Sequence, residues 1–213
     1  MATYLFDFDG TLVDSMPTYV SAMLRILDDN GIPYGDDLVK TITPLGVLGT
    51  AQYYIKLGIN LPIETIVEQM KIYLLDGYLH TIPAKPHVAE ALRTLKARGD
   101  DLHVLTASPH VTLDPCLERV GLASLFDNIW SCDDFGTTKA DPEIYKMAAA
   151  RIGKPVNEIL FLDDNLSADQ TAKIAGITVC GVYDESSKEY VDEIKAVTDH
   201  YIYDFSELPK LKF

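Results

Sequence analysis

Acidic residues follow two apolar segments of this sequence at points where strands are expected to end. Asp7 and Asp9 close the first segment, and Asp163 and Asp164 close a later one. Because Asp7 and Asp9 are two residues apart, an extended chain directs both side chains to the same side. Buried carboxylates are costly without partners, and several together raise one another's pKa. A cation is therefore expected among them, and four oxygen ligands favour magnesium over zinc.

A hydroxyl residue and a lysine occupy comparable positions. Thr106 and Ala107 lie at the end of a strand expected over 102–106, and Lys139 precedes a helix expected from Pro142. Ligands of open α/β sheets bind outside the carboxyl ends of the strands, so these groups should meet the acidic residues. Each of them alone fits an ordinary turn, strand end or surface cation. Their order along the chain favours a single site.

Strands that alternate with helices would position these residues. Strands are expected over 3–8, 102–106, 129–131, 159–162 and 177–182. Helices are expected around 20–27, 88–95, 109–120 and 142–152, and a further helix follows the strand over 159–162 and ends at about residue 175. Short β-branched and aromatic runs favour the strands, and apolar residues three and four apart favour the helices. The alternation predicts an α/β fold, a doubly wound parallel sheet covered on both faces.

A helical segment interrupts the alternation. From about Asp36 to Ile82 the apolar residues repeat at helical spacing, and no strand pattern is present. Prolines at both borders, including Pro17 and Pro83, favour extended connections. We expect two domains, an α/β catalytic core of residues 1–14 and 84–213 and a helical domain of residues 15–83.

Composition limits the class of partner. The 213 residues carry a formal net charge of −14, and 47% of them are hydrophobic, which is ordinary for a globular chain that buries a substantial core. The negative charge would repel nucleic acid and anionic membranes. A small phosphate ester can still bind where a metal ion and a few cations offset the local field. We therefore expect a small-molecule substrate and neither a nucleic acid nor a membrane as partner; the oligomeric state is not indicated.

The cysteines and the first residues favour a cytoplasmic protein. Cys116, Cys132 and Cys180 are widely spaced and odd in number, which suits buried, reduced thiols. The sequence shows no basic, cleavable leader and no apolar stretch of about 20 residues.

Four motifs in this order resemble those of the haloacid dehalogenase superfamily. DFDGTLVDS at 7–15 is highly specific, FLDDNLSAD at 161–169 supports it, and LTAS at 105–108 and KADPEIY at 139–145 gain weight from their order. The resemblance runs over almost the whole chain, and the helical segment is similar to the cap of the phosphoglycolate phosphatase and β-phosphoglucomutase branch. It implies a Rossmann-like core with an inserted helical cap. It also implies a magnesium-dependent phosphatase that hydrolyses a small phosphate monoester through an aspartyl phosphate.

The resemblance implies roles for the acidic residues. Asp7 would be the nucleophile, consistent with carboxylates that form aspartyl phosphates. Asp9 would be the general acid for the leaving oxygen and then the general base for water. Magnesium would be held by Asp7, Asp164 and the backbone carbonyl of Asp9. Asp163 would be a further ligand or a neighbour of the ligands.

The remaining roles concern the phosphoryl group. By resemblance, Thr106 and the amide of Ala107 would bind its oxygens, and Lys139 would neutralise its charge and that of the nucleophile. Ala140 replaces a proline that the family often has after the lysine, so this loop is expected to be less rigid. Asp169 fits a further acidic position of the last motif or, equally, an exposed acid that a helix N-terminus stabilises.

Three rival interpretations remain. A β-phosphoglucomutase-like mutase shares the core, but Tyr19 occupies the neighbourhood of its usual cap histidine. A dehalogenase would lack the second aspartate of the first motif, and Asp9 is present. A phospho-acceptor signalling domain also surrounds magnesium with acidic residues, a hydroxyl and a lysine, but it would not need the helical segment.

The choice of substrate is not readable from the helical segment. The tyrosines of this segment either line a pocket or pack in a core, and aromatic residues at helical spacing more often pack in a core. These tyrosines are Tyr53, Tyr54, Tyr73 and Tyr78.

Overall fold

The computed structural model describes residues 1–35, 37–42 and 45–213. These residues divide into two compact units: unit 1 consists of Met1–Asp14 and Pro83–Phe213, and unit 2 consists of Ser15–Ile82. Asp36, the expected start of the helical segment, lies outside the described residues.

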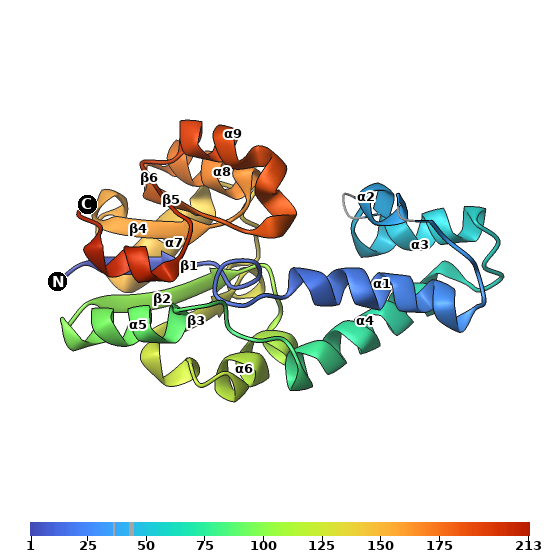
Figure 1. Ribbon diagram of the computed structural model, residues 1–213. Coiled ribbons are helices and arrows are strands. Elements are labelled where there is room, and N and C mark those ends of the chain that lie inside the picture. The colour runs from blue at the N-terminus through green and yellow to red at the C-terminus, as the bar shows by residue number, and fades with distance from the viewer. Residues whose placement is uncertain (36, 43–44) are drawn as a thin grey trace. The chain divides into compact units, whose positions relative to one another are not determined.

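Unit 1 is built on a six-stranded parallel sheet (Figure 1). In sheet order, the strands are β3 (Asn128–Ser131), β2 (Asp101–Thr106), β1 (Thr3–Phe6), β4 (Ile159–Asp163), β5 (Thr178–Val182) and β6 (His200–Ile202). β1 pairs with both β2 and β4, so the first strand of the chain is central and the strand order reverses beside it. All four residues of β1 are buried, as expected for a strand covered on both faces.

Helices cover both faces of this sheet (Figure 1). The helices of unit 1 are α5 (Val88–Ala97), α6 (His110–Arg119), α7 (Glu143–Ile152), α8 (Leu166–Ala175) and α9 (Val191–Val197). Alternate side chains of β1 point to opposite faces. Leu5 joins a cluster with Ile144 of α7 and Ala172 of α8, whereas Phe6 stacks on Phe205 near the chain end. The predicted α/β fold with a doubly wound parallel sheet is confirmed.

Two local features differ from the expectation. β1 ends at Phe6 instead of at residue 8, because the Phe8 carbonyl accepts hydrogen bonds from the amides of Leu12 and Val13 and so belongs to a turn. Beyond β5, α9 and β6 were not expected from the sequence. β6 has only three residues, which is too few for a recognisable alternation.

The described part of unit 2 contains four α-helices and no strand (Figure 1). They are α1 (Met16–Asp29), α2 (Leu38–Ile42), α3 (Gly46–Lys56) and α4 (Ile63–His80). Apolar side chains three and four residues apart, such as Ile66 and Met70 of α4, pack with Ile26 of α1 in a hydrophobic core that belongs to this unit. Each unit therefore buries its own apolar side chains.

The tyrosines of unit 2 divide between core and surface. Tyr54 and Tyr78 are buried, and the Tyr54 hydroxyl donates to the Met23 carbonyl at 2.9 Å. Tyr53 packs against the same core while partly exposed. Tyr73 also packs against it and borders an open surface pocket between α1 and α4. The core interpretation is correct for Tyr54 and Tyr78.

The cysteines agree with the expectation of buried, reduced thiols. Cys116, Cys132 and Cys180 are buried free thiols. Over residues 1–35, 37–42 and 45–213, none of the helices combines the length and the apolar character that crossing a membrane requires.

Candidate active site

The carboxyl ends of β1 and β4 bring three carboxylates together. The Asp7 amide donates to the Leu162 carbonyl at 2.8 Å, which continues the register that pairs Phe6 with Leu162. Because side chains alternate in step along the two strands, Asp7 and Asp163 point to the same face. One carboxylate oxygen each from Asp7, Asp163 and Asp164 lies within 4.8 Å of the others, and all three residues are buried.

Lys139 supplies a cation to this acidic group. Its ammonium contacts the carboxylate of Asp7 and lies 2.8 Å from that of Asp163. The side chain of Asp141 accepts a hydrogen bond of 3.0 Å from the amide two residues further on, at the start of α7. Lys139 thus reaches Asp7 and Asp163 although Ala140, and not a proline, follows it.

The charges of the acidic group do not balance. Burial raises the pKa of Asp7 to about 7, even though Lys139 favours its charged form, and Asp163 adds to the rise. Burial, followed by the charges of Asp163 and Asp7, also raises the pKa of Asp164 well above its usual value. Burial disfavours the ammonium of Lys139, but Asp163 and Asp7 outweigh this effect and raise its pKa. Closely spaced, hard oxygen atoms that lack positive charge fit a divalent ion such as Mg²⁺.

Asp9 is joined to the loop after β2. Asp9 is partly buried, and its carboxylate accepts a hydrogen bond from the Ser108 hydroxyl. The Ser108 amide in turn donates to the hydroxyl oxygen of Thr106 at 3.1 Å. Thr106 is buried and Ala107 is exposed. Ser108, for which the motifs predict no role, thus links the second aspartate of the first motif to the hydroxyl of the second motif.

The turn after β1 also contacts Asp164. Gly10 has a φ of +75°, and a Cβ atom there would lie 2.5 Å from the Oδ2 atom of Asp164. The Thr11 hydroxyl donates to the Oδ1 atom of Asp164 at 3.0 Å. Glycine at position 10 is therefore required twice, by its backbone conformation and by the approach of this carboxylate.

We expect Gly10→Ala to lower the free energy of unfolding by about 1–3 kcal/mol through backbone strain and also to weaken Mg²⁺ binding, because the new methyl group displaces Asp164. Gly121→Ala is the matched control, since Gly121 has a φ of +72° and open space where the Cβ would lie. Urea unfolding of both variants measures the cost of backbone strain, and Mg²⁺ titration of both variants measures the effect of displacing Asp164. Equal Mg²⁺ affinities would show that Asp164 is not displaced.

Asp169 is fully buried, and neither of its carboxyl oxygens has a hydrogen-bond partner among the described residues. Burial, followed by the charges of Asp163 and Asp164, raises the pKa of Asp169 to about 9. The interpretation of Asp169 as an exposed acid is therefore wrong, because the first turn of α8 directs this side chain inward.

Comparison with known proteins identifies the family. A model of the haloacid dehalogenase-like hydrolases matches residues 4–182. The chain belongs to the haloacid dehalogenase-like hydrolase family. The match extends from β1 to the end of β5 and so includes each strand end that contributes to the acidic group. This haloacid dehalogenase-like hydrolase is accordingly an enzyme.

Relatives within the haloacid dehalogenase-like hydrolases include named phosphatases. The chain is 29% identical over 180 residues to the phosphorylated carbohydrates phosphatase of Thermotoga maritima, a match that covers 83% of this chain and 82% of the relative. It is 27% identical over 184 residues to a phosphoglycolate phosphatase of Pseudomonas putida, over 84% of this chain and 68% of the relative.

Solved structures point to the same branch. A crystal structure described as "putative beta-phosphoglucomutase from Thermotoga maritima" matches with a TM-score of 0.85 and 25% identity, over 99% of this chain and 97% of that one. The resemblance to the phosphoglycolate phosphatase and β-phosphoglucomutase branch is thus confirmed, and the named relatives support a phosphatase.

Proposed function

We propose that this enzyme is a magnesium-dependent phosphatase that hydrolyses a small-molecule phosphate monoester through an aspartyl phosphate on Asp7. The observation that carries the proposal is the buried carboxylate group of Asp7, Asp163 and Asp164 with the ammonium of Lys139 against it. Phosphoryl transfer requires a positioned nucleophile and compensation of negative charge, and this set offers both.

Asp7 would attack the phosphorus atom. The Lys139 ammonium contacts the Oδ1 atom of Asp7 and also binds Asp163. The lysine would thus orient the attacking carboxylate of Asp7 relative to the carboxylate of Asp163. Asp7, Asp163, Asp164 and the backbone carbonyl of Asp9 would hold Mg²⁺. When bound, this ion supplies a Lewis acid that offsets the charge of the phosphoryl oxygens.

Asp9 would first protonate the leaving oxygen and then accept a proton from the attacking water. Its hydrogen bond with the Ser108 hydroxyl holds the carboxylate beside the loop after β2. In that loop the Thr106 hydroxyl oxygen accepts a hydrogen bond from the Ser108 amide, which leaves the Thr106 hydroxyl proton available to donate to a phosphoryl oxygen. The Ala107 amide would bind a second phosphoryl oxygen.

The rival functions differ in what they require. A dehalogenase needs no acid for a leaving oxygen, whereas Asp9 lies two residues after Asp7 and close to the loop of Thr106. A mutase would return the phosphoryl group to a sugar, and Tyr19 stands near the position where a mutase has its histidine. A signalling domain would not need unit 2. We propose that residues 15–83 form a cap that selects the substrate.

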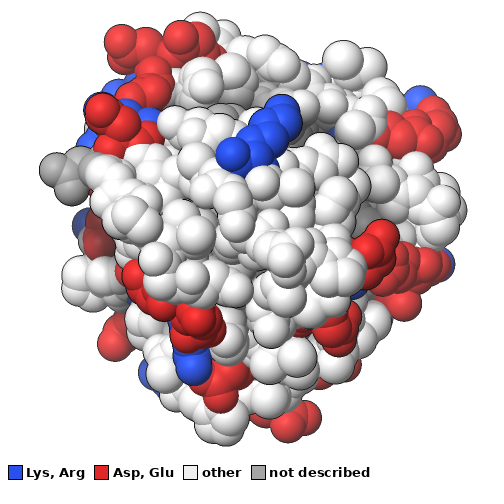
Figure 2. Space-filling view, turned by 90° about the vertical axis from the view of Figure 1, so that its right-hand side faces the viewer, with Lys and Arg blue, Asp and Glu red and all other residues white. Residues whose placement is uncertain are grey.

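Charge supports a small substrate. With a net charge of −14, the chain repels extended polyanions. Figure 2 shows a face on which acidic side chains cover more area than basic ones. We therefore propose a small-molecule partner and no nucleic-acid or membrane partner. The free, buried thiols of the three cysteines support the further proposal of a cytoplasmic location.

The direct test is release of inorganic phosphate from a panel of phosphate monoesters with Mg²⁺ and purified protein. Hydrolysis of at least one ester with multiple turnovers is expected. Conversion of one sugar phosphate into its isomer without net release would assign a mutase instead. A stable phosphoprotein that persists for many minutes without turnover would assign a signalling domain.

We expect activity to require Mg²⁺ and to be inhibited by Ca²⁺. Calcium takes six to eight oxygen ligands at about 2.3–2.6 Å, compared with about 2.0–2.1 Å for magnesium. A larger ion would therefore engage both oxygens of Asp7 and leave none to attack. Initial rates at fixed substrate, with Mg²⁺ constant and Ca²⁺ increasing, measure the effect. Equal rates with either ion, or full activity in a chelator, would contradict the proposed metal site.

A further inference from the structure

Lys85 makes three hydrogen bonds with its side chain in unit 1. Its ammonium donates to the Gly10 carbonyl at 2.6 Å, to the Tyr183 carbonyl at 2.6 Å and to the Oδ2 atom of Asp184 at 2.9 Å. A lysine ammonium has three N–H donors, so each donor has an acceptor. The side chain is 14% exposed and that of Asp184 is 5% exposed, so solvent contributes little to these contacts.

The backbone of Lys85 binds the turn that contains Gly10. The Lys85 amide donates to the Leu12 carbonyl at 3.0 Å, and the neighbouring Ala84 forms an antiparallel bridge with Val13. The lysine is therefore attached to this turn at both of its ends. Its amide holds the second half of the turn and its ammonium holds the first half.

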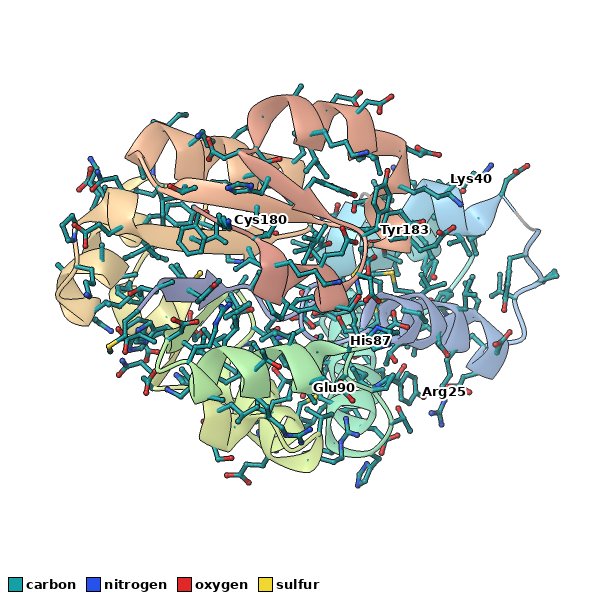
Figure 3. All side chains as sticks on the ribbon, turned by 60° about the vertical axis from the view of Figure 1, so that its left-hand side comes forward. Arg25, Lys40, His87, Glu90, Cys180 and Tyr183 are labelled. Atoms are coloured by element: carbon teal, nitrogen blue, oxygen red, sulfur yellow. The ribbon has the colours of Figure 1, made fainter. Side chains whose placement is uncertain are left out.

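The ammonium also ties the turn to the segment after β5. Figure 3 places Tyr183 at the carboxyl end of β5 and His87 at the start of α5, on the same edge of unit 1. Asp184 accepts a hydrogen bond from the Ser186 amide at 2.9 Å, so its carboxylate is itself fixed. The Gly10 carbonyl is thereby connected, through one ammonium, to a fixed part of the core.

The turn that Lys85 holds carries groups of the candidate active site. Asp9 directly precedes Gly10. Thr11 donates to the carboxylate of Asp164, and this carboxylate fills the space that a Cβ atom at Gly10 would need. A shift of the Gly10 carbonyl therefore moves the proposed acid and base at one side and a proposed metal ligand at the other. In catalysis a misplacement of about 1 Å can reduce the rate by about 10²-fold.

Charge alone does not explain this arrangement. Burial and the carboxylates of Asp163 and Asp7 dominate the raised pKa of Asp164, and the charges of Asp184 and Lys85 act on that pKa in opposite directions. An ion pair of two opposite charges leaves a weak net field at the acidic group. The hydrogen bond from Lys85 to the Gly10 carbonyl is directional, and the charge of Asp184 does not cancel its effect on the position of this carbonyl.

We propose that Lys85 is a positioning residue that holds the Gly10 carbonyl and so fixes the turn carrying Asp9 beside Asp164. The proposal rests on the phosphatase function proposed above, for which it adds a residue that none of the four motifs contains. Lys85 touches neither the substrate nor the reacting atoms in this role.

The test compares Lys85→Met with Lys96→Met. Lys96 also forms an ion pair in unit 1, at 2.9 Å from Asp127, but contacts no group of the candidate site. Lys85→Met should lower kcat by about 10²-fold with a smaller change in KM, and Lys96→Met should leave both unchanged. An unchanged kcat in Lys85→Met would overturn the proposal.

The double variant Lys85→Met, Asp184→Asn separates position from charge. It removes both charges of the pair but does not replace the hydrogen bond to the Gly10 carbonyl, so kcat should stay low. Recovery of kcat in the double variant would overturn the proposal and assign a purely electrostatic effect. If Lys85→Met does not fold, Lys85→Arg keeps the charge but cannot aim three donors at the same acceptors, and the same fall in kcat is expected.

Amide hydrogen exchange supplies a readout that needs neither metal nor substrate. The amides of Leu12 and Val13, which bond to the Phe8 carbonyl, should exchange faster in Lys85→Met than in the wild type or in Lys96→Met. Unchanged exchange would overturn the proposal. If these amides exchange faster but the wild-type enzyme hydrolyses no phosphate ester, the proposed phosphatase function is wrong, whereas the role of Lys85 in positioning the turn is supported.

Discussion

Replacing Asp7 by asparagine is expected to abolish phosphate release while the protein remains folded. The amide keeps the shape of the side chain, but it cannot form an acyl phosphate and removes one charge from the proposed metal site. Burial raises the pKa of Asp7 to about 7. The folded wild-type protein therefore loses stability as the pH rises from the pKa that Asp7 has in the unfolded chain towards 7, because the buried carboxyl must then ionise. Without metal, Asp7→Asn should therefore unfold at a temperature at least as high as the wild type at pH 8.

Activity and thermal unfolding must be measured on the same preparation to separate chemistry from folding. Asp192→Asn is the control, since Asp192 is an exposed acid in the first turn of α9 and should retain full activity. Phosphate release by Asp7→Asn near the wild-type rate would contradict the covalent mechanism. Loss of activity together with loss of cooperative unfolding would show a structural requirement for the carboxylate instead.

Replacing Asp9 by asparagine is expected to block both proton transfers while substrate binding survives. The nucleophile and the Asp9 backbone carbonyl remain in place, but no group protonates the leaving oxygen or activates water. Each such assistance contributes about 10²–10⁴ in rate. We therefore expect kcat to fall by at least about 10²-fold with a smaller change in KM.

The leaving group separates the two steps that Asp9 serves. A nitrophenolate needs no proton, so a nitrophenyl ester should rescue formation of the aspartyl phosphate more than its hydrolysis. The aspartyl phosphate should then accumulate and be trapped by rapid acid quench. Undiminished kcat of Asp9→Asn with both alkyl and nitrophenyl esters would show that Asp9 has only a structural role.

The sequence predicts the main geometry of the site because that geometry follows from strand ends. Asp7 directly follows β1 and Asp163 ends β4, and parallel pairing of the two strands is enough to place both carboxylates at one edge. Lys139 was expected there by its motif, and the structure places it between these two carboxylates.

Other parts of the site depend on contacts that local patterns do not encode. The burial of Asp169 requires knowing which face of α8 packs on the sheet. The bond from Ser108 to Asp9 joins loops 99 residues apart. Lys85 lies in a segment that the sequence marks only by its prolines, and the acceptors of its ammonium come from two distant turns. These features are products of the tertiary fold.

The central position of β1 has a consequence for biosynthesis. β1, which Asp7 directly follows, is made before the other strands of the sheet, and its two partners β2 and β4 follow only at Asp101–Thr106 and Ile159–Asp163. Residues 15–82, which form a separate core, are translated between them. Lys139 precedes Asp163 and Asp164 in the chain. Lys139 therefore leaves the ribosome before Asp163 and Asp164, the two carboxylates that repel Asp7 in the folded site.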